Sequence, residues 1–324
     1  MATEGWREVR LDRGVKVRAD SLYAVSSLKE MMFLLGPRLA LVLGLLILPL
    51  ILPNLYWQRV LCIFGIYALL AIGFDFLANY VGLVSLGGAL FVGVGGYISG
   101  LLNSTFGLPP ALAMIIATVA GAFICTLLLL PTLPLRGVYF AIVSFVYPLI
   151  SIRLIVATGV FGGTEGISGL DMLPNIWVSQ YLIIGAVLIC LFVFRRLVNE
   201  DVGLVFRGLK DNEQTIRASG ISITYYKAVA VFIAALPGCL AGAYLTHLYG
   251  WVGTSLFALD FSVFPVATSV VGGPGTLAGP VLAALILLPM SEALRAFGTL
   301  RIVFYSILIV LFIVFWREGL LNYL

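Results

Sequence analysis

The sequence predicts an all-α membrane protein: a polytopic helix bundle with about ten transmembrane or partly broken helices and both termini cytoplasmic. One reason is composition, because 61% of the 324 residues are hydrophobic and 10% are charged, whereas a soluble domain carries about 25% charged residues. Such a chain cannot cover its apolar surface with polar groups, so its solvent is largely lipid. Soluble enzymes, secreted modules and disordered tails are therefore excluded.

The second reason is a series of apolar runs of about 20 residues, the length that a helix needs to cross the hydrocarbon core of a bilayer. Residues 1–35 precede these runs as an N-terminal arm, and residues 36–324 form the transmembrane domain. The eighth and ninth runs are short and interrupted by glycine. The runs lie near residues 36–53, 58–79, 84–104, 110–130, 137–157, 177–194, 227–249, 258–273, 276–291 and 300–316.

The distribution of basic residues predicts the orientation. Two basic clusters occur, one in the N-terminal arm and one around residues 195–226, and cytoplasmic segments are enriched in Lys and Arg. Six apolar runs separate the clusters and four more follow, so both clusters and both termini face the cytoplasm. The Gly-rich loop 158–176 then faces outward. Acidic residues are interspersed in the arm, which argues against a nucleic-acid partner despite the net charge of +4.

The polar stretch 195–226 has a helical pattern. Asp201 is expected to cap a helix that continues through Phe206 and Ile216, and Gly220 falls where a C-terminal glycine belongs. The helix presents charges of both signs to water. A solvated loop helix without a partner is the alternative interpretation.

Glycine interrupts one apolar segment in each half of the chain, near residues 81–88 and 271–276. Non-helical backbone at membrane depth persists only where protein or a wet cavity satisfies it, and paired breaks of this kind point to a transport route. Both segments are therefore predicted to line or adjoin the route, although close helix packing is an alternative for any single glycine. The candidate path residues are Asp75, Ser85, Gly87, Gly88, Gly272, Gly273 and Gly275.

Few residues within the runs offer chemistry. Asp75 should face the bundle interior or water, because a charge at the bilayer centre costs about 2.5–3.5 kcal/mol. His247 is expected to be a hydrogen-bonded residue near a span end rather than a ligand. The four cysteines are isolated in apolar runs, so neither a metal site nor a cofactor is predicted. No lysine follows a glycine, which excludes a phosphate-binding loop; a nucleotide motor would be a separate chain docking on residues 195–226.

Five segments in the same order resemble motifs of one family. Residues 79–88 (NYVGLVSLGG) resemble GYxGQxSLGH, and residues 135–142 (LRGVYFAI) resemble LRGxYFAI. Residues 162–169 (GGTEGISG) resemble TGGxxGLxG. The segments GLKDNE and ASGI within 208–221 resemble AIRDNE and ALGI, and residues 271–280 (VGGPGTLAGP) resemble LGGxGxxxGP. The chain is identified as similar to the permease subunits of branched-chain amino-acid ABC importers, the LivM-like family.

The resemblance implies a multi-pass permease in the bacterial plasma (inner) membrane. It would pair with a LivH-like second permease, two cytoplasmic ATPase subunits that bind ATP, and an external solute-binding protein. Gly163 and Glu165 would lie where the binding protein docks. The internal helix would couple the chain to the ATPase through Arg207, Lys210, Asp211, Asn212, Glu213, Arg217 and Gly220.

Several departures leave the solute open. Leu83 and Gly88 replace the usual Gln and His, Asp75 stands where Asn is common, and residues 214–217 replace an Ala-rich acidic run. Urea, short amides and aromatic carboxylates are alternatives to branched-chain amino acids. A stand-alone secondary carrier or channel is the alternative class, although one isolated Asp makes a poor proton relay. A membrane enzyme acting on lipid has no clustered catalytic residues in its favour.

Overall fold

The computed structural model describes residues 42–50, 54–135, 137–294, 307 and 310. The N-terminal arm, half of the first predicted span, most of the last one, Arg136 and the C-terminus lie outside the described residues. Two compact units divide the chain, Met1–Leu48 and Pro49–Leu324. In the first unit, the described residues from 42 onward are helical. All features below belong to the second unit.

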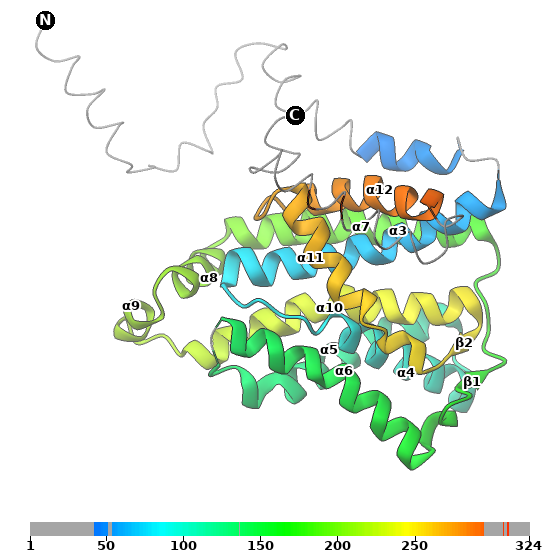
Figure 1. Ribbon diagram of the computed structural model, residues 1–324, viewed down its shortest axis with the longest axis horizontal. Helices are drawn as coiled ribbons and strands as arrows, with labels where there is room; N and C mark the ends of the chain where they lie inside the picture. Colours follow the sequence, from blue (N-terminus) through cyan, green and yellow to red (C-terminus); the bar gives the residue numbers. More distant parts are fainter. Residues whose placement is uncertain (1–41, 51–53, 136, 295–306, 308–309, 311–324) are drawn as a thin grey trace, which may run out of the picture. The chain divides into compact units, whose positions relative to one another are not determined.

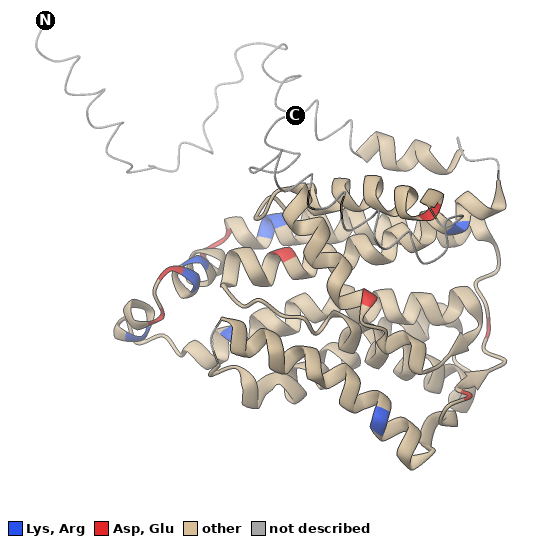
Figure 2. Ribbon diagram, viewed as in Figure 1, with Lys and Arg blue, Asp and Glu red and all other residues tan. Residues whose placement is uncertain are grey.

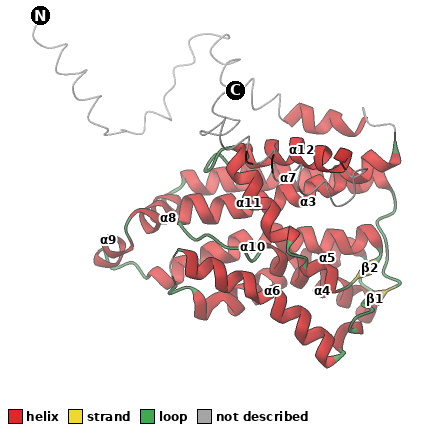
Figure 3. Ribbon diagram, in the orientation of Figure 1, coloured by secondary structure: helices red, strands yellow, loops and turns green. Residues whose placement is uncertain are grey.

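The second unit is built almost entirely from helices (Figure 3). The helical elements are α3 (Leu55–Asp75), the π-helix η2 (Phe76–Val81), α4 (Gly88–Phe106), α5 (Pro110–Leu129), η3 (Leu130–Thr132), α6 (Val138–Thr158), η4 (Val160–Gly162), α7 (Ile176–Asn199), α8 (Asp201–Asp211), α9 (Glu213–Ala218), α10 (Ile223–Tyr249), η5 (Thr254–Phe257), α11 (Asp260–Gly272) and α12 (Ala278–Ala293).

Seven helical segments among the described residues are long and apolar enough to cross a bilayer. They coincide with the second to eighth predicted runs, so these seven predictions are confirmed at the level of helix position. The ninth run forms α12, whose 16 residues are shorter than the usual spanning length. The full set of ten helices and the cytoplasmic side of the termini stay predictions.

Two short strands depart from the all-α prediction. The strands β1 (Ile167–Ser168) and β2 (Trp251–Val252) pair antiparallel, with Ile167 opposite Val252. The pair joins the 158–176 loop to the segment that follows α10. Two-residue strands have no sequence pattern of their own, and their pairing depends on helices that bring distant loops together.

Many of the glycines lie where the backbones of two helices are in close contact. Helix α10 packs most extensively against α4 and α5, and α3 packs against α7, α10, α11 and α12. A Cβ atom on Gly95 of α4 would lie 2.3 Å from the carbonyl oxygen of Cys239, and one on Gly242 of α10 would lie 2.0 Å from that of Val92. Side chains at these positions would push α4 and α10 apart, so these glycines serve helix packing.

The helices present two distinct ends (Figure 1). At one end lie α8 and α9, and at the other lie β1 and β2; we refer to these as the α8–α9 end and the β1–β2 end. Charged residues concentrate at the α8–α9 end and are sparse along the helices (Figure 2). The loops 195–226 and 158–176 therefore lie at opposite ends, as the span order predicts.

Candidate functional site

The polar stretch at the α8–α9 end is two helices rather than one. In α8, Phe206 and Leu209 are buried while Arg207 and Lys210 are exposed, so the helix is amphipathic. It ends at Asp211, because Asn212 adopts an extended conformation and its side chain accepts hydrogen bonds from the backbone N–H groups of the next helix, at 2.9 and 3.3 Å. An N-cap of this type starts a new helix. The prediction of one continuous helix is therefore wrong.

Of the two predicted helix ends, the one at Asp201 is wrong and the one at Gly220 agrees with the structure. Asp201 is the first residue of α8, its N-cap is Glu200, and no side-chain cap hydrogen bond forms there; the predicted Asp201 cap is wrong. Gly220 has a φ of +78°, and its N–H bonds to the carbonyl of Arg217, as expected of a C-terminal glycine. The two helices pack closely, because a Cβ atom on Gly208 would lie 2.6 Å from Cδ1 of Ile216.

Helix α8 is docked on the π-helix η2. The Lys210 ammonium donates to the carbonyl of Asn79 at 2.9 Å, and the Arg207 guanidinium lies 5.8 Å from the centre of the Tyr80 ring. Beneath them, the Phe206 ring meets Phe76 edge-on at 5.4 Å. A polar and an aromatic layer thus hold α8 against the end of α3.

Gly82 follows η2, and its backbone lies close to α8. Gly82 has a φ of +79°, a left-handed conformation that favours glycine. A Cβ atom on Gly82 would also lie 3.1 Å from Cα of Lys210. The π-helix interrupts the i→i−4 backbone hydrogen bonds at the end of α3. Lys210 donates to the Asn79 carbonyl there.

Asp75 is the centre of a buried hydrogen-bond network one turn before Asn79. Its side chain is fully buried, and its Oδ1 accepts hydrogen bonds from Asn79 Nδ2 and Ser269 Oγ, each at 2.7 Å, and from the Gly275 N–H at 3.0 Å. Its Oδ2 accepts from the Leu277 N–H at 3.0 Å. Four donors satisfy the carboxylate, so Asp75 faces the bundle interior as predicted.

The loop that Asp75 holds is the glycine break between α11 and α12. Gly273 and Gly275 have φ values of +110° and +79°, and Leu277 is held at a φ of +58°, which is costly for a residue with a side chain. The Tyr80 hydroxyl donates to the Gly275 carbonyl. Contacts therefore run without interruption from Lys210 in α8, through Asn79 and Asp75, to this loop.

A buried ion pair anchors the start of α9. Glu213 Oε1 lies 2.6 Å from Lys227 Nζ in α10, and the Lys227 side chain is 3% exposed. The ammonium also lies 3.4 Å from the carbonyl of Leu133. The sequence predicts Glu213 to be a solvent-facing charge and does not indicate a role for Lys227, because the two residues lie in separate elements.

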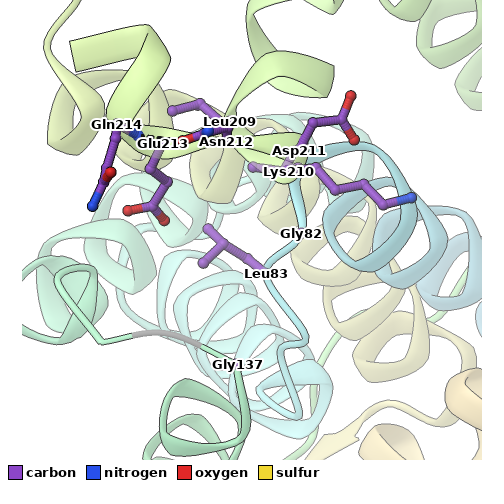
Figure 4. Close-up of a pocket in the computed structure, with 10 residues that line it drawn as sticks. Gly82, Leu83, Gly137, Leu209, Lys210, Asp211, Asn212, Glu213 and Gln214 are labelled. Atoms are coloured by element: carbon purple, nitrogen blue, oxygen red, sulfur yellow. Dashed lines mark hydrogen bonds between the residues drawn. The ribbon is translucent and has the colours of Figure 1, made fainter. Parts of the chain in front are cut away.

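A cavity of about 400 Å³ lies beside the junction of α8 and α9. It is lined by residues 81–83, by Gly137 and by residues 209–214. Figure 4 shows the side chains of Leu83 and Glu213 turned toward this space, while Lys210 extends away from it. Four of the predicted coupling residues line this cavity, namely Lys210, Asp211, Asn212 and Glu213. Arg207 lies over Tyr80 outside it, Arg217 is exposed on α9, and Gly220 is exposed after the end of that helix.

The first predicted path segment is tightly packed. Ser85 Oγ accepts from the Gly87 N–H at 3.2 Å, and a Cβ atom on Gly88 would lie 2.4 Å from the carbonyl oxygen of Phe261 in α11. Ser85 and Gly88 line a cavity of about 20 Å³, which is room for about one water molecule.

The second predicted path segment packs in the same way. A Cβ atom on Gly272 would lie 2.2 Å from backbone atoms of Gly279, so α11 and α12 touch at these two glycines. Since Gly88 lies against Phe261 near the start of α11 and the second segment begins at the end of the same helix, α11 connects the two broken segments. Their role in translocation stays a prediction.

The loop at the β1–β2 end carries the two predicted docking residues. Gly163 is buried with a φ of +55°, while Glu165 is exposed. The Trp251 indole N–H donates to the backbone carbonyl of Glu165 at 3.1 Å, which fixes the loop next to β2. Of the two, Glu165 therefore offers its side chain at the surface.

His247 fastens this loop to the helices. Its Nδ1 lies 2.8 Å from the carbonyl oxygen of Asp171, and its Nε2 lies 2.9 Å from Ser99 Oγ. Since a carbonyl oxygen only accepts, Nδ1 donates, and the serine hydroxyl donates to Nε2 of the neutral ring. Asn103 Nδ2 adds a hydrogen bond to the Asp171 carboxylate at 2.9 Å. His247 is fully buried, and the prediction of a hydrogen-bonded residue near a span end is confirmed.

Comparison with known proteins gives one consistent family. Residues 56–316 match the family described as "Branched-chain amino acid transport system / permease component". The chain is 29% identical over 287 residues to the high-affinity branched-chain amino acid transport system permease protein LivM of Salmonella typhimurium and to that of Escherichia coli, covering 79% of this chain and 68% of each relative. A probable branched-chain amino acid transport permease protein LivM of Methanocaldococcus jannaschii is 24% identical over 271 residues, covering 70% of this chain and 78% of the relative. No solved structure matches the chain significantly.

Proposed function

Because the chain belongs to the family of branched-chain amino acid transport system permease components, an ABC-type permease family, we propose that it is the transmembrane subunit of an ATP-driven importer. The solute is a branched-chain amino acid or a related small polar solute. The subunit works in the bacterial inner membrane with a second permease, two cytoplasmic ATPase subunits and an external solute-binding protein. ATP binds to the ATPase subunits.

One observation carries the coupling role of α8 and α9: the hydrogen-bond path from Lys210 through Asn79 and Asp75 to the Gly275 and Leu277 N–H groups. A helix that an ATPase displaces must transmit the displacement to the membrane-spanning part. Because α8 is bonded to η2, and η2 to the break between α11 and α12, a rigid shift of α8 moves that break. The buried Glu213–Lys227 pair passes the same shift to α10.

The β1–β2 end has features that suit docking of the solute-binding protein. The loop with Glu165 is held in place by Trp251 and His247 rather than left free. A fixed loop lowers the entropy cost of docking, because its side chains are already ordered when the partner arrives. We propose that the solute-binding protein docks at the β1–β2 end.

Reconstitution tests the proposal. The chain in proteoliposomes, alone or with its second permease, two ATPases and binding protein, is assayed for uptake of radiolabelled leucine. We expect uptake only in the full assembly with ATP. Uptake by the chain alone would contradict the proposal and favour a secondary carrier or channel.

A pair of matched variants tests the coupling path within that assembly. Lys210→Met removes the bond to the Asn79 carbonyl, and we expect less solute to be moved per ATP hydrolysed. Arg196→Met is the control, because Arg196 is a cation at the same end whose ion pair with Glu200 is exposed to solvent: the two side chains are 74% and 51% exposed. This variant should leave the amount of solute moved per ATP unchanged. Equal ratios in both variants would remove the role of Lys210.

A further inference from the structure

A second large cavity lies away from the α8–α9 end, among α3, α10, η5 and the start of α11. Its volume is about 460 Å³, within the range of small-molecule sites. Aromatic side chains dominate its lining, with Tyr67, Tyr249, Trp251 and Phe261, and one carboxylate belongs to it, that of Asp260. An apolar wall with a single charge is the composition of a site that orients an amphipathic solute.

The cavity reaches deep into the bundle. Tyr67 stacks on Phe261 at 5.5 Å and meets Phe264 at 4.4 Å between ring centres. Tyr67 is twelve residues beyond Leu55, the first residue of α3, which at about 1.5 Å per residue places it about 18 Å along the helix. Since the hydrocarbon core is about 30 Å thick, Asp260, which directly precedes Phe261, lies near the middle of the membrane-spanning helices.

Asp260 differs from Asp75 in having no hydrogen-bond or ion-pair partner among the described residues. Asp75 is fully buried under four donors, whereas Asp260 is exposed and forms no hydrogen bond or ion pair within the part of the chain that the structure describes. Its place in the first turn of α11 offsets only about 0.3–1 kcal/mol, against about 2.5–3.5 kcal/mol for a charge at such depth. The carboxylate therefore needs water or a cationic group in the cavity.

We propose that this cavity is a solute-binding site within the permease, for a small molecule that carries an ammonium group beside an apolar side chain. The ammonium pairs with Asp260, the apolar group rests on Leu245, Leu256 and the Tyr67 and Phe261 rings, and Ser255 offers a hydroxyl to a carboxylate. An aliphatic α-amino acid such as leucine has this chemistry. Aromatic carboxylates without an ammonium are repelled by Asp260, and urea lacks the apolar group. The choice of an amino acid rests on the proposed transport function.

Equilibrium binding to the assembled transporter tests the site. The complex, purified with its second permease and ATPases but without binding protein or ATP, is titrated with radiolabelled L-leucine. Isopentylamine, which keeps the ammonium, and 4-methylpentanoate, which keeps the carboxylate, are used as competitors. We expect the amine to compete and the acid not to. Asp260→Asn should weaken leucine binding about 10- to 100-fold, the loss that follows from removing one charge-assisted contact, while Asp260→Glu keeps most of it.

A matched carboxylate variant distinguishes Asp260 from acidic residues elsewhere in the chain. Glu200→Gln removes a carboxylate outside the cavity and should bind leucine as the wild type does. Unchanged leucine affinity in Asp260→Asn, or equal competition by both analogues, would overturn the proposal. Loss of the second permease from the Asp260→Asn complex would also overturn it, because the cavity would then be a subunit contact. ATP-dependent uptake by the wild-type assembly reports on the proposed function independently of these results.

Discussion

Replacing Asp75 with Asn perturbs the junction between α3 and the glycine break without changing its volume. The amide oxygen can keep the three bonds that Oδ1 now accepts, from Asn79, Ser269 and Gly275. The amide nitrogen then faces the Leu277 N–H, which is 3.0 Å from Oδ2, and two donors cannot pair. The Leu277 N–H is left without an acceptor at a residue that is 4% exposed.

The magnitude follows from three terms. The orphaned N–H costs about 1–3 kcal/mol. Three bonds to a charge become neutral bonds and lose about 1 kcal/mol each, and removal of the buried charge returns about 2.5–3.5 kcal/mol. The last two terms nearly cancel, so Asp75→Asn should destabilise the chain by about 1–3 kcal/mol. At roughly 2 °C per kcal/mol the melting midpoint falls by about 2–6 °C.

Thermal unfolding followed with a thiol-reactive fluorophore measures this effect, because Cys62, Cys125 and Cys239 are fully buried and react only after unfolding. Glu200→Gln is the control, since it removes an exposed carboxylate whose pair with Arg196 is screened by solvent, and it should melt within about 1 °C of the wild type. An Asp75→Asn midpoint equal to that of the control would refute the reasoning that Asp75 holds the break.

Three further substitutions have expected outcomes. Glu213→Gln leaves the buried Lys227 ammonium without its counter-charge and should destabilise by about 3 kcal/mol. The double variant with Lys227→Met should recover most of that loss in the same melting assay; no recovery would mean that the pair is not coupled. Gly273→Leu places a side chain at a φ of +110° and should lower folded yield and uptake, so normal values of both would contradict the strained loop. His247→Ala breaks the bonds to Ser99 and Asp171 and should speed hydrogen exchange in the 158–176 loop while leaving exchange in α8 unchanged.

The sequence predicts the helices and the two glycine breaks well, but it predicts neither the π-helix nor the division between α8 and α9. Apolar runs locate seven spans because hydrophobic length is a local property that the bilayer imposes. The π-helix at the end of α3 has no such signature, and the division of α8 from α9 depends on one side chain, that of Asn212, turning back to cap the next helix. Hydrophobic periodicity continues across that break, which is why it predicts a single helix.

The candidate site is predictable in its charges but not in their partners. Asp75 is conspicuous as an ionisable residue inside a span, and His247 as a lone histidine near a span end. Two of the four donors to Asp75 are backbone N–H groups about 200 positions further along the chain, and every residue except proline carries such a group. Lys227 is similarly hidden, because only the folded chain brings α9 against α10.

Site-directed cross-linking from the α8–α9 end tests the coupling assignment most directly. A photoreactive maleimide is attached in the assembled transporter to cysteine in place of Arg217, exposed on α9, or in place of Ser104, exposed near the end of α4 toward β1 and β2. We predict a covalent product with the ATPase subunit from position 217 and none from position 104. An ATPase product from position 104, or none from position 217, would contradict the account.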